Sequence, residues 1–228
     1  MAAMDMPFDP LPEPLTEAGF RALARRGLHA GPSDAVFDPR SGLALGQGDW
    51  DLNPELKADL AAMAPPRPAA VLVPIVLRAE LTVLLTERSH DVPSHPGQIS
   101  FPGGKMETSD ATPIDCALRE AHEEIGLGAD RIEPLGYLDG YRTGTGFQIS
   151  PVVALVKPGF EPVLDPREVL EVFEVPLAFL MDEANHQKHA REWRGRQRSF
   201  YAMPYEDRYI WGATAGMIKN MHQRLFQR

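Results

Sequence analysis

The chain has 228 residues, which suits one domain with an extension, and its 43% hydrophobic and 24% charged residues are typical of a globular protein. The 23 basic and 32 acidic residues give a formal net charge of −9, which argues against binding to nucleic acids or membrane surfaces through net charge. The single cysteine, Cys116, excludes a disulfide framework and a cysteine-rich zinc site.

The N-terminus and the apolar stretches give no sign of membrane insertion. Residues 1–14 contain no basic residue and no apolar run, so we expect no secretory signal there. The longest apolar stretch, 69–77, is too short to cross a bilayer. We therefore expect a cytoplasmic protein with no membrane partner.

The first third of the chain differs in composition from the rest. Residues 1–68 are rich in Pro, Gly and Asp and carry two short helical patterns, at 15–26 and at 53–63, the second with Asn53 at its N-cap. We expect an N-terminal extension that packs on a core domain spanning 69–228. Three roles stay open for the extension: it could cover a sheet edge, support a homodimer or gate a site.

From residue 69 onward, helical and strand patterns are mixed. The order of elements favours an α+β fold in which helices cover mixed sheets. The expected elements are a hairpin of strands at 69–77 and 81–87, a short strand within 97–105, a helix at 113–125, strands at 132–141 and 147–157, a short helix at 175–182, a hairpin at 189–203 that turns at Gly195, and a helix at 211–226.

The helix at 113–125 has clear boundary signals. Thr112 can cap its N-terminus, Pro113 suits the first helical position, and Gly126 can end it. At about 100° per residue, its apolar residues fall between about 60° and 160° from Glu120, which predicts a buried face. These residues are Ile114, Ala117, Leu118, Ala121 and Ile125.

Three carboxylates lie together on another side of this helix. With Glu120 at 0°, Glu124 falls at about 40° and Glu123 at about 300°, within one third of the circumference. Arg119, four residues before Glu123, can offset part of their repulsion, and a hard divalent cation such as Mg²⁺ or Mn²⁺ would offset more. The triplet alone is more typical of a solvated helix face, so the flanking residues decide the interpretation.

Those flanks complete a longer pattern, because a double glycine precedes the helix and R-E-x-x-E-E-x-G ends it. The pattern resembles the Nudix box, which reads Gly, five residues, Glu, seven residues and then R-E-U-x-E-E-x-G-U. Two features depart from the box: the separation from Gly104 to Arg119 is one residue longer, and the loop acid is Asp110 rather than Glu. The matching positions are Gly104, Arg119, Glu120, Ala121, Glu123, Glu124, Gly126 and Leu127.

The segment before the helix narrows the resemblance. Residues 84–104 read LLTERSHDVPSHPGQISFPGG, which is similar to the signature of Nudix coenzyme A pyrophosphatases, L-L-T-x-R-S followed by Gly and F-P-G-G. The longer box also resembles that subfamily, as do 145–153, 165–169 and 210–215. Pro93 stands where the signature usually carries Arg, Lys or Thr, which leaves the substrate open.

The resemblance implies a Nudix-type α/β/α sandwich with mixed sheets and a metal-dependent hydrolase. The implied reaction cleaves the diphosphate linkage of coenzyme A or acyl-CoA to adenosine 3′,5′-bisphosphate and 4′-phosphopantetheine or its acyl derivative, with Mg²⁺ or Mn²⁺. The alternative is a Nudix hydrolase of another nucleoside diphosphate derivative, such as ADP-ribose or a dinucleotide. A non-catalytic nucleotide-binding Nudix domain is disfavoured because all three glutamates of the box are present.

The resemblance also assigns roles to individual residues. Glu120 and Glu124 are the first metal ligands, and Glu123 and the carbonyl of Gly103 are further ones. Arg119 orients the carboxylates, while the general base is either Glu123 or Glu168. Two residues are expected beside the substrate: Gly104 through its backbone, and Arg88 at a phosphate. For Arg88 the alternative is a structural salt bridge.

Two features outside the box have simpler interpretations. Alternating basic residues on the hairpin at 189–203 are typical of a solvated edge, so we expect no nucleic-acid partner. These residues are Lys188, Arg191, Arg194, Arg196 and Arg198. We expect Trp211 to be an apolar anchor of the last helix rather than an adenine-stacking platform. We expect Cys116 to be a small packed side chain rather than an oxidation-sensitive residue that lines the site.

Overall fold

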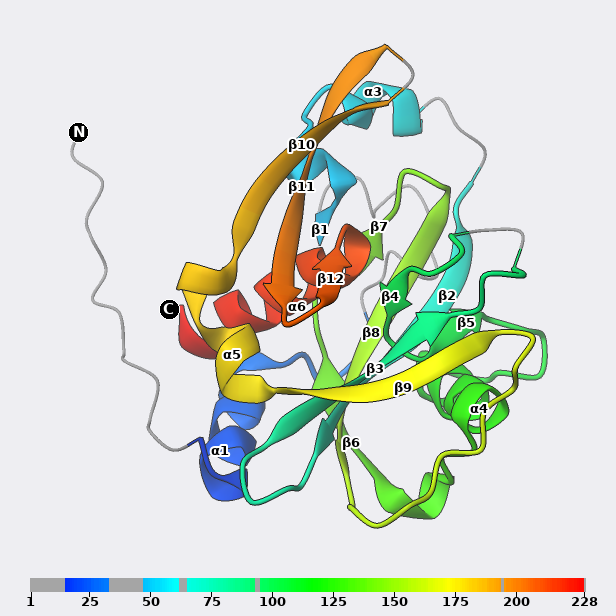
Figure 1. The fold of residues 1–228 in the computed structure, drawn as a ribbon, viewed down its shortest axis with the longest axis vertical. Coiled ribbons are helices and arrows are strands. Elements are labelled where there is room, and N and C mark those ends of the chain that lie inside the picture. The colour runs from blue at the N-terminus through cyan, green and yellow to red at the C-terminus, as the bar shows by residue number, and fades with distance from the viewer. Residues whose placement is uncertain (1–14, 33–46, 62–64, 93–94, 194, 228) are drawn as a thin grey trace.

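The computed structural model describes residues 15–32, 47–61, 65–92, 95–193 and 195–227, which form two sheets and the helices around them (Figure 1). The larger sheet contains β1 (Gln47–Gly48), β2 (Arg67–Val76), β3 (Thr82–Arg88), β4 (Ile99–Ser100), β5 (Gly103–Lys105), β6 (Ile132–Tyr137), β7 (Tyr141–Arg142), β8 (Phe147–Val156) and β9 (Val169–Pro176). The smaller sheet contains β10 (Gln187–Trp193), β11 (Arg196–Tyr205) and β12 (Arg208–Trp211). The α-helices are α1 (Glu17–Gly27), α3 (Leu56–Ala61), α4 (Pro113–Ile125), α5 (Leu177–Met181) and α6 (Ala213–Phe226).

The centre of the larger sheet is the pair β2 and β8. These strands run parallel and pair along their full length, from Arg67 opposite Phe147 to Val76 opposite Val156. Both faces of β2 are buried, since Val73 belongs to one hydrophobic cluster and Leu72 to the other. The sequence of a strand that is buried on both faces is a continuous apolar run, which explains the composition of 69–77.

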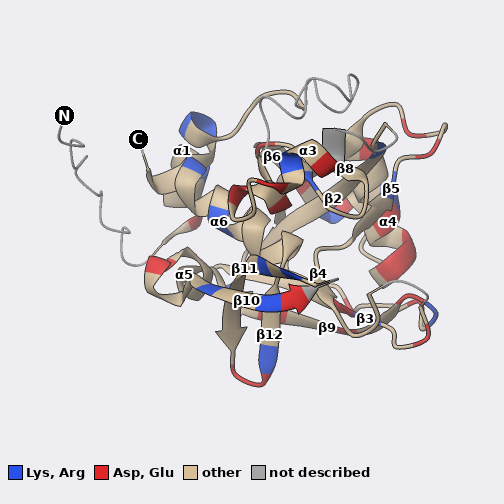
Figure 2. Ribbon diagram, turned by 90° about the horizontal axis from the view of Figure 1, so that it is seen from above, with Lys and Arg blue, Asp and Glu red and all other residues tan. Residues whose placement is uncertain are grey.

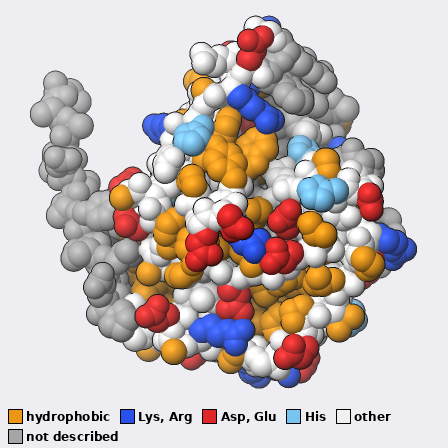
Figure 3. All heavy atoms as spheres, viewed as in Figure 1, with side chains coloured by type: hydrophobic (Ala, Val, Ile, Leu, Met, Phe, Trp, Pro, Cys, Tyr) orange, Lys and Arg blue, Asp and Glu red, His pale blue; other side chains and the backbone are white. Residues whose placement is uncertain are grey.

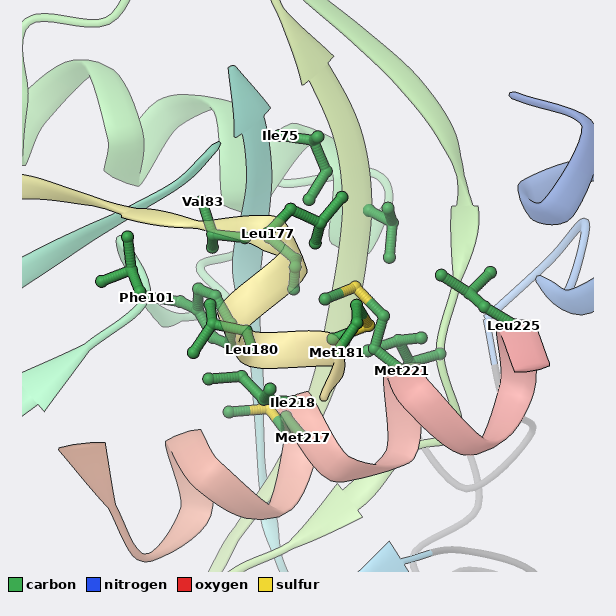
Figure 4. Close-up of a cluster of buried hydrophobic side chains, with 14 of the residues drawn as sticks. Ile75, Val83, Phe101, Leu177, Leu180, Met181, Met217, Ile218, Met221 and Leu225 are labelled. Carbon is green, nitrogen blue, oxygen red and sulfur yellow. The ribbon is translucent and has the colours of Figure 1, made fainter. Parts of the chain in front are cut away.

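Helices cover both faces of this sheet, as expected for an α/β/α sandwich. On one face α4 packs on β2, β5 and β8. On the other, α5, α6 and the smaller sheet enclose a cluster in which Leu177 and Leu180 of α5 meet Ile218 and Met221 of α6 (Figure 4). No helix in the described part of the chain is long and apolar enough to span a membrane.

Helix α1, which precedes β2 in the chain, packs into this same core. Phe20 and Leu23 of α1 are buried in the cluster that contains α6, and the Arg224 guanidinium donates to the carbonyl of Gly27 at 2.8 Å. A Cβ atom at Gly27 would lie 2.3 Å from the Arg224 carbonyl oxygen, so the two helices approach closely because this position is glycine.

The pairing of several strands differs from the sequence-based expectation. The hairpin at 69–77 and 81–87 forms, but β2 and β3 pair only at Ile75–Val83 and Val76–Thr82. The long partner of β3 is β9, a strand that we did not expect. Its pairing joins segments about 90 residues apart in the sequence, which local patterns do not reveal.

Three element boundaries were also wrong. The strand expected at 132–141 divides into β6 and β7, because the backbone N–H of Asp139 leaves the sheet and donates to the Asn220 side chain of α6 at 3.1 Å. The single strand expected within 97–105 is divided into β4 and β5. The final helix begins at Ala213 rather than at Trp211, which lies in β12.

Asn53 has a tertiary role instead of the expected N-cap, and α3 begins only at Leu56. The Asn53 amide donates to the carbonyls of Asp49 at 2.7 Å and Ser199 at 2.8 Å. Its side-chain oxygen accepts from the Ser199 N–H at 2.8 Å. Asn53 therefore fixes the segment before α3 to β11.

We expect Asn53→Ala to lower the free energy of unfolding by about 2 kcal/mol, because the buried amide makes three hydrogen bonds and its loss leaves backbone groups of Ser199 without them. Urea denaturation measures the change. The control is Glu55→Ala, which removes a half-exposed ion pair to Arg198 and should cost less than about 1 kcal/mol. Equal losses for both variants would contradict this role of Asn53.

Candidate active site

Helix α4 is fixed at both ends by local hydrogen bonds. The Thr112 hydroxyl accepts from the Asp115 N–H at 3.2 Å, and the Asp115 carboxylate accepts from the Thr112 N–H at 2.8 Å, which completes a capping box. Gly126 ends the helix with φ +70°. The expected bounds at 113–125 are confirmed, so the angular positions of the three glutamates hold.

Arg119 connects this helix to the preceding loop. Its guanidinium donates to both carboxylate oxygens of Asp110, at 3.0 and 2.9 Å, which is a bidentate pair. The Nη1 atom of Arg119 donates to Glu120 and to Glu123, each at 2.9 Å, and its Nη2 atom donates to the Lys105 carbonyl at 3.1 Å. Arg119 also holds the pKa of Asp110 below its usual value. The loop acid thus anchors the arginine that orients the helix carboxylates.

Glu124 is the most deeply buried carboxylate of the box, with 3% of its surface exposed. The Gly103 N–H donates to its Oε2 at 3.1 Å, and Arg88 Nη1 lies 4.0 Å from its Oε1. Burial raises the pKa of Glu124 to about 8, and the neighbouring Glu120 and Glu168 carboxylates raise it further against the effect of Gly103 and Arg88. Burial also raises the pKa of Glu120.

The two glycines of the loop, Gly103 and Gly104, allow the loop to lie close to helix α4, but for different reasons. Gly103 has φ +154°, and a Cβ atom there would lie 2.4 Å from the Ala70 carbonyl oxygen. At Gly104 a Cβ atom would lie 2.5 Å from Glu120 Oε1. Gly103 is therefore required by the backbone, whereas Gly104 leaves room for the Glu120 carboxylate.

The two candidate bases lie in different surroundings. Glu168 belongs to the loop before β9, where its carbonyl accepts from the Ser89 N–H at 2.9 Å, and it lines the same cavity as Arg88 and Gly104. The Glu123 side chain is 57% exposed and is held by Arg119. The structure thus gathers the expected site residues, with Glu123 on their outer side. Pro93 lies outside the described residues.

The carboxylate chemistry fits a hard divalent cation. Within the described residues, no three His, Cys, Asp or Glu side chains converge as a preformed metal cluster. Glu120 and Glu124 nevertheless offer oxygen ligands one helical turn apart, and Glu120 raises the pKa of Glu124 by repulsion. A bound cation would relieve this repulsion and hold both groups ionised.

A cavity of about 1700 Å³ extends from Arg88, Gly103 and Gly104 to the smaller sheet, and the three glutamates of helix α4 are not among the residues that line it. Figure 2 shows acidic residues on α4 and basic residues along β10 and β11, on different parts of the molecule. The walls of the cavity come from three regions: the Nudix-like loop with Gly103 and Gly104, the segment 47–53, and the smaller sheet with Phe200 and Trp211.

Two sequence-based interpretations are corrected by the residues of the smaller sheet that line the cavity. Trp211 lines the cavity from β12 instead of anchoring the last helix. Arg191, Arg196 and Arg198 line it too, so they do not form only a solvated edge, while Arg194 lies outside the described residues. Their alternation on one hairpin face, close in sequence to Trp211, was the signal that could have placed them here.

The NUDIX domain profile matches residues 66–197. The chain belongs to the Nudix family. It is 36% identical over 170 residues to "Uncharacterized Nudix hydrolase NudL" of Enterobacter sp. (strain 638), covering 75% of this chain and 87% of the relative. A relative of the same description in Citrobacter koseri is 39% identical over 155 residues, covering 68% and 81%.

Among solved structures, the fold is similar to the C. elegans Ap4A hydrolase binary complex, with a TM-score of 0.43, 19% identity and coverage of 48% of this chain and 80% of that one. The family identifies the chain as a pyrophosphohydrolase that acts on a nucleoside diphosphate derivative.

We expect Gly104→Ala to lower hydrolase activity by at least about tenfold with little change in the melting temperature, because the new methyl group displaces only the flexible end of Glu120. Gly31→Ala is the matched control, since its Cβ atom would meet nothing within 4 Å. Full activity of Gly104→Ala would mean that the position of the Glu120 carboxylate is unimportant.

Proposed function

We propose that the protein hydrolyses the diphosphate linkage of coenzyme A or acyl-CoA and that it requires Mg²⁺ or Mn²⁺. The observation that carries this proposal is the position of Arg88, which belongs to the coenzyme A signature and lies 4.0 Å from Glu124 of the Nudix box. The two motifs therefore contribute to one site. The cavity of about 1700 Å³ beside them suits a long substrate.

In this reaction a water oxygen bonds to one phosphorus, and the bond from that phosphorus to the bridging oxygen breaks. The bridging oxygen leaves with the other phosphate, and the water proton passes to a base. The diphosphate resists attack because its own negative charge repels the nucleophile. Divalent cations held there would neutralise this charge and lower the pKa of a bound water.

We propose that Glu120 and Glu124 hold the cation, with Glu123 and the Gly103 carbonyl as further ligands. Arg88 binds a substrate phosphate, for which its planar guanidinium is suited. Arg119 is a positioning residue, since it orients Glu120 through the contact at 2.9 Å and is itself held by Asp110.

Glu168 is our proposed general base. Glu168 lines the cavity, and its charge raises the pKa of both Glu120 and Glu124. Both observations support its position close to these carboxylates. Glu123 is the less favoured base, because the Arg119 guanidinium donates to its carboxylate at 2.9 Å and more than half of its side chain is exposed.

We propose that 1–68 is an extension of the hydrolase domain at 69–228 and that it completes the substrate site. Asp49 supports this role, because it lines the cavity and accepts hydrogen bonds from the Tyr141 hydroxyl at 2.9 Å and the Gly144 N–H at 2.7 Å. The extension thus contributes one wall of the cavity.

The first experiment is mass spectrometry of the products formed from coenzyme A with Mg²⁺ or Mn²⁺. We expect adenosine 3′,5′-bisphosphate and 4′-phosphopantetheine from the wild type, and at least about a hundredfold less of both from Glu120→Gln or after chelation of the metal. Cleavage of ADP-ribose or a dinucleotide but not of coenzyme A would overturn the substrate assignment and keep the hydrolase. Equal activity of Glu120→Gln would overturn the metal site.

A second experiment separates the two candidate bases. We expect Glu168→Gln to lower kcat by about a hundredfold, because the glutamine cannot accept the water proton. Glu123→Gln should lower kcat by less than about tenfold. The reverse pattern in the two kcat values would assign the base to Glu123.

A further inference from the structure

Three polar side chains are buried on the side of the larger sheet that faces away from the cavity, and we call them the buried polar cluster. They are Arg142 of β7 and Gln148 and Ser150 of β8, which are 4%, 1% and 2% exposed. In the described part of the chain, five of their side-chain atoms have no hydrogen-bond partner. These atoms are Nε and Nη1 of Arg142, Nε2 and Oε1 of Gln148, and Oγ of Ser150.

Strand register places the three side chains on one side of the sheet. Arg142 lies opposite Gln148 in the antiparallel pair of β7 and β8, and Ser150 follows two residues after Gln148. Paired residues and alternate residues point to the same side of a sheet. The adjacent pair, Tyr141 and Ile149, points to the other side, where both residues line the cavity. The buried polar cluster is therefore separate from the candidate active site, although the same strands carry both.

The neighbours of the cluster along the sheet are apolar. Strand β2 places Pro68 beside Gln148 and Ala70 beside Ser150, and neither of these β2 side chains carries a polar atom. Further along β8, Val152 belongs to the hydrophobic cluster that contains the buried face of α4. Buried polar atoms without partners are rare in folded proteins, so five of them in one place call for an explanation.

Arg142 carries a charge that the described residues do not offset. On the molecular surface, basic and acidic side chains lie side by side, and water hydrates them as well (Figure 3). Arg208, for example, pairs with Glu171 at 2.9 Å. Arg142 has no such pair among the described residues, and its burial lowers the pKa of its guanidinium. A buried guanidinium without a counter-charge destabilises the fold, which indicates that the cluster lacks a component.

The unpaired atoms define the chemistry of that component. The guanidinium and amide nitrogens donate hydrogen bonds and the Ser150 hydroxyl can donate one, which suits the oxygens of an anion. Water can satisfy the amide and the hydroxyl, but only an anion also balances the charge of Arg142. The Oε1 atom of Gln148 only accepts, so the ligand must also donate one hydrogen bond. Inorganic phosphate at neutral pH retains a P–O–H group that can donate it, whereas sulfate and carboxylates have no such proton.

We propose that the buried polar cluster binds one inorganic phosphate ion that retains a proton. Arg142, Gln148 Nε2 and the Ser150 hydroxyl donate to the phosphate oxygens, and the P–O–H group donates to Gln148 Oε1. This site is independent of the proposed function, because it lies on the opposite side of β7 and β8 from the cavity.

The test is calorimetric titration of the full chain with inorganic phosphate in the presence of a metal chelator, so that no phosphate binds through a cation. We expect the wild type to bind phosphate and Arg142→Met to bind it at least about tenfold more weakly, because methionine has neither the charge nor the donors. Gln148→Glu should weaken binding by a similar factor, because a carboxylate repels the anion and can pair with Arg142. The control is Arg88→Gln, which removes a cation from the wall of the cavity and should keep the affinity within about twofold.

A parallel titration with sulfate tests the need for a proton on the ligand. We expect sulfate to bind at least about tenfold more weakly than phosphate, because it leaves Gln148 Oε1 without a donor. Equal affinities for the two ions would overturn the assignment to phosphate. No phosphate binding by the wild type, equal binding by Arg142→Met, or a loss in Arg88→Gln alone would overturn the site. Thermal unfolding in phosphate-free buffer establishes that the variants are folded, and if Arg142→Met is not, Gln148→Glu decides the same question.

Discussion

The guanidinium of Arg119 spans the gap between the loop after β5 and helix α4, with a bidentate pair to Asp110 on one side and contacts to Glu120 and Glu123 on the other. Carboxylates that lie close together and partly buried on one helix repel one another, and a nearby positive charge offsets this repulsion. Arg119 supplies that charge between Asp110 and the two glutamates. Glu120 and Glu124 therefore keep oxygen atoms for a ligand, and the loop that carries Gly103 and Gly104 is fixed against them.

The cavity depends on a second constraint, the parallel pairing of β2 with β8. This pairing forms a rigid floor whose two faces carry different layers, with α4 on one and α5 and α6 on the other. The carboxylates of the Nudix box come from one layer, while the smaller sheet lies beside the other. The cavity therefore has walls from segments that are far apart in the sequence.

The sequence predicted the features that depend on interactions between residues close together in the chain. It did not predict those that depend on distant residues. The bounds of α4 were predictable because Thr112, Asp115 and Gly126 act within a few residues of the helix ends. The relation of Arg119 to Glu123 follows from a four-residue spacing, and the resemblance to the Nudix box supplied the rest of the site. By contrast, β9 and the role of Asn53 depend on partners far along the chain, Thr82–Arg88 and Ser199. Trp211 was misplaced for another reason, since it belongs to β12, whose pairing with β11 a helical pattern does not reveal.

Cys116 has a consequence for an enzyme whose proposed substrate is itself a thiol. The side chain is fully buried, its sulfur donates to the Lys105 carbonyl at 3.5 Å, and burial raises the pKa of the thiol to about 12. Thiolates, not thiols, exchange with disulfides, so burial and the raised pKa disfavour exchange between this sulfur and a disulfide at neutral pH. A mixed disulfide between the proposed substrate and Cys116 is therefore disfavoured.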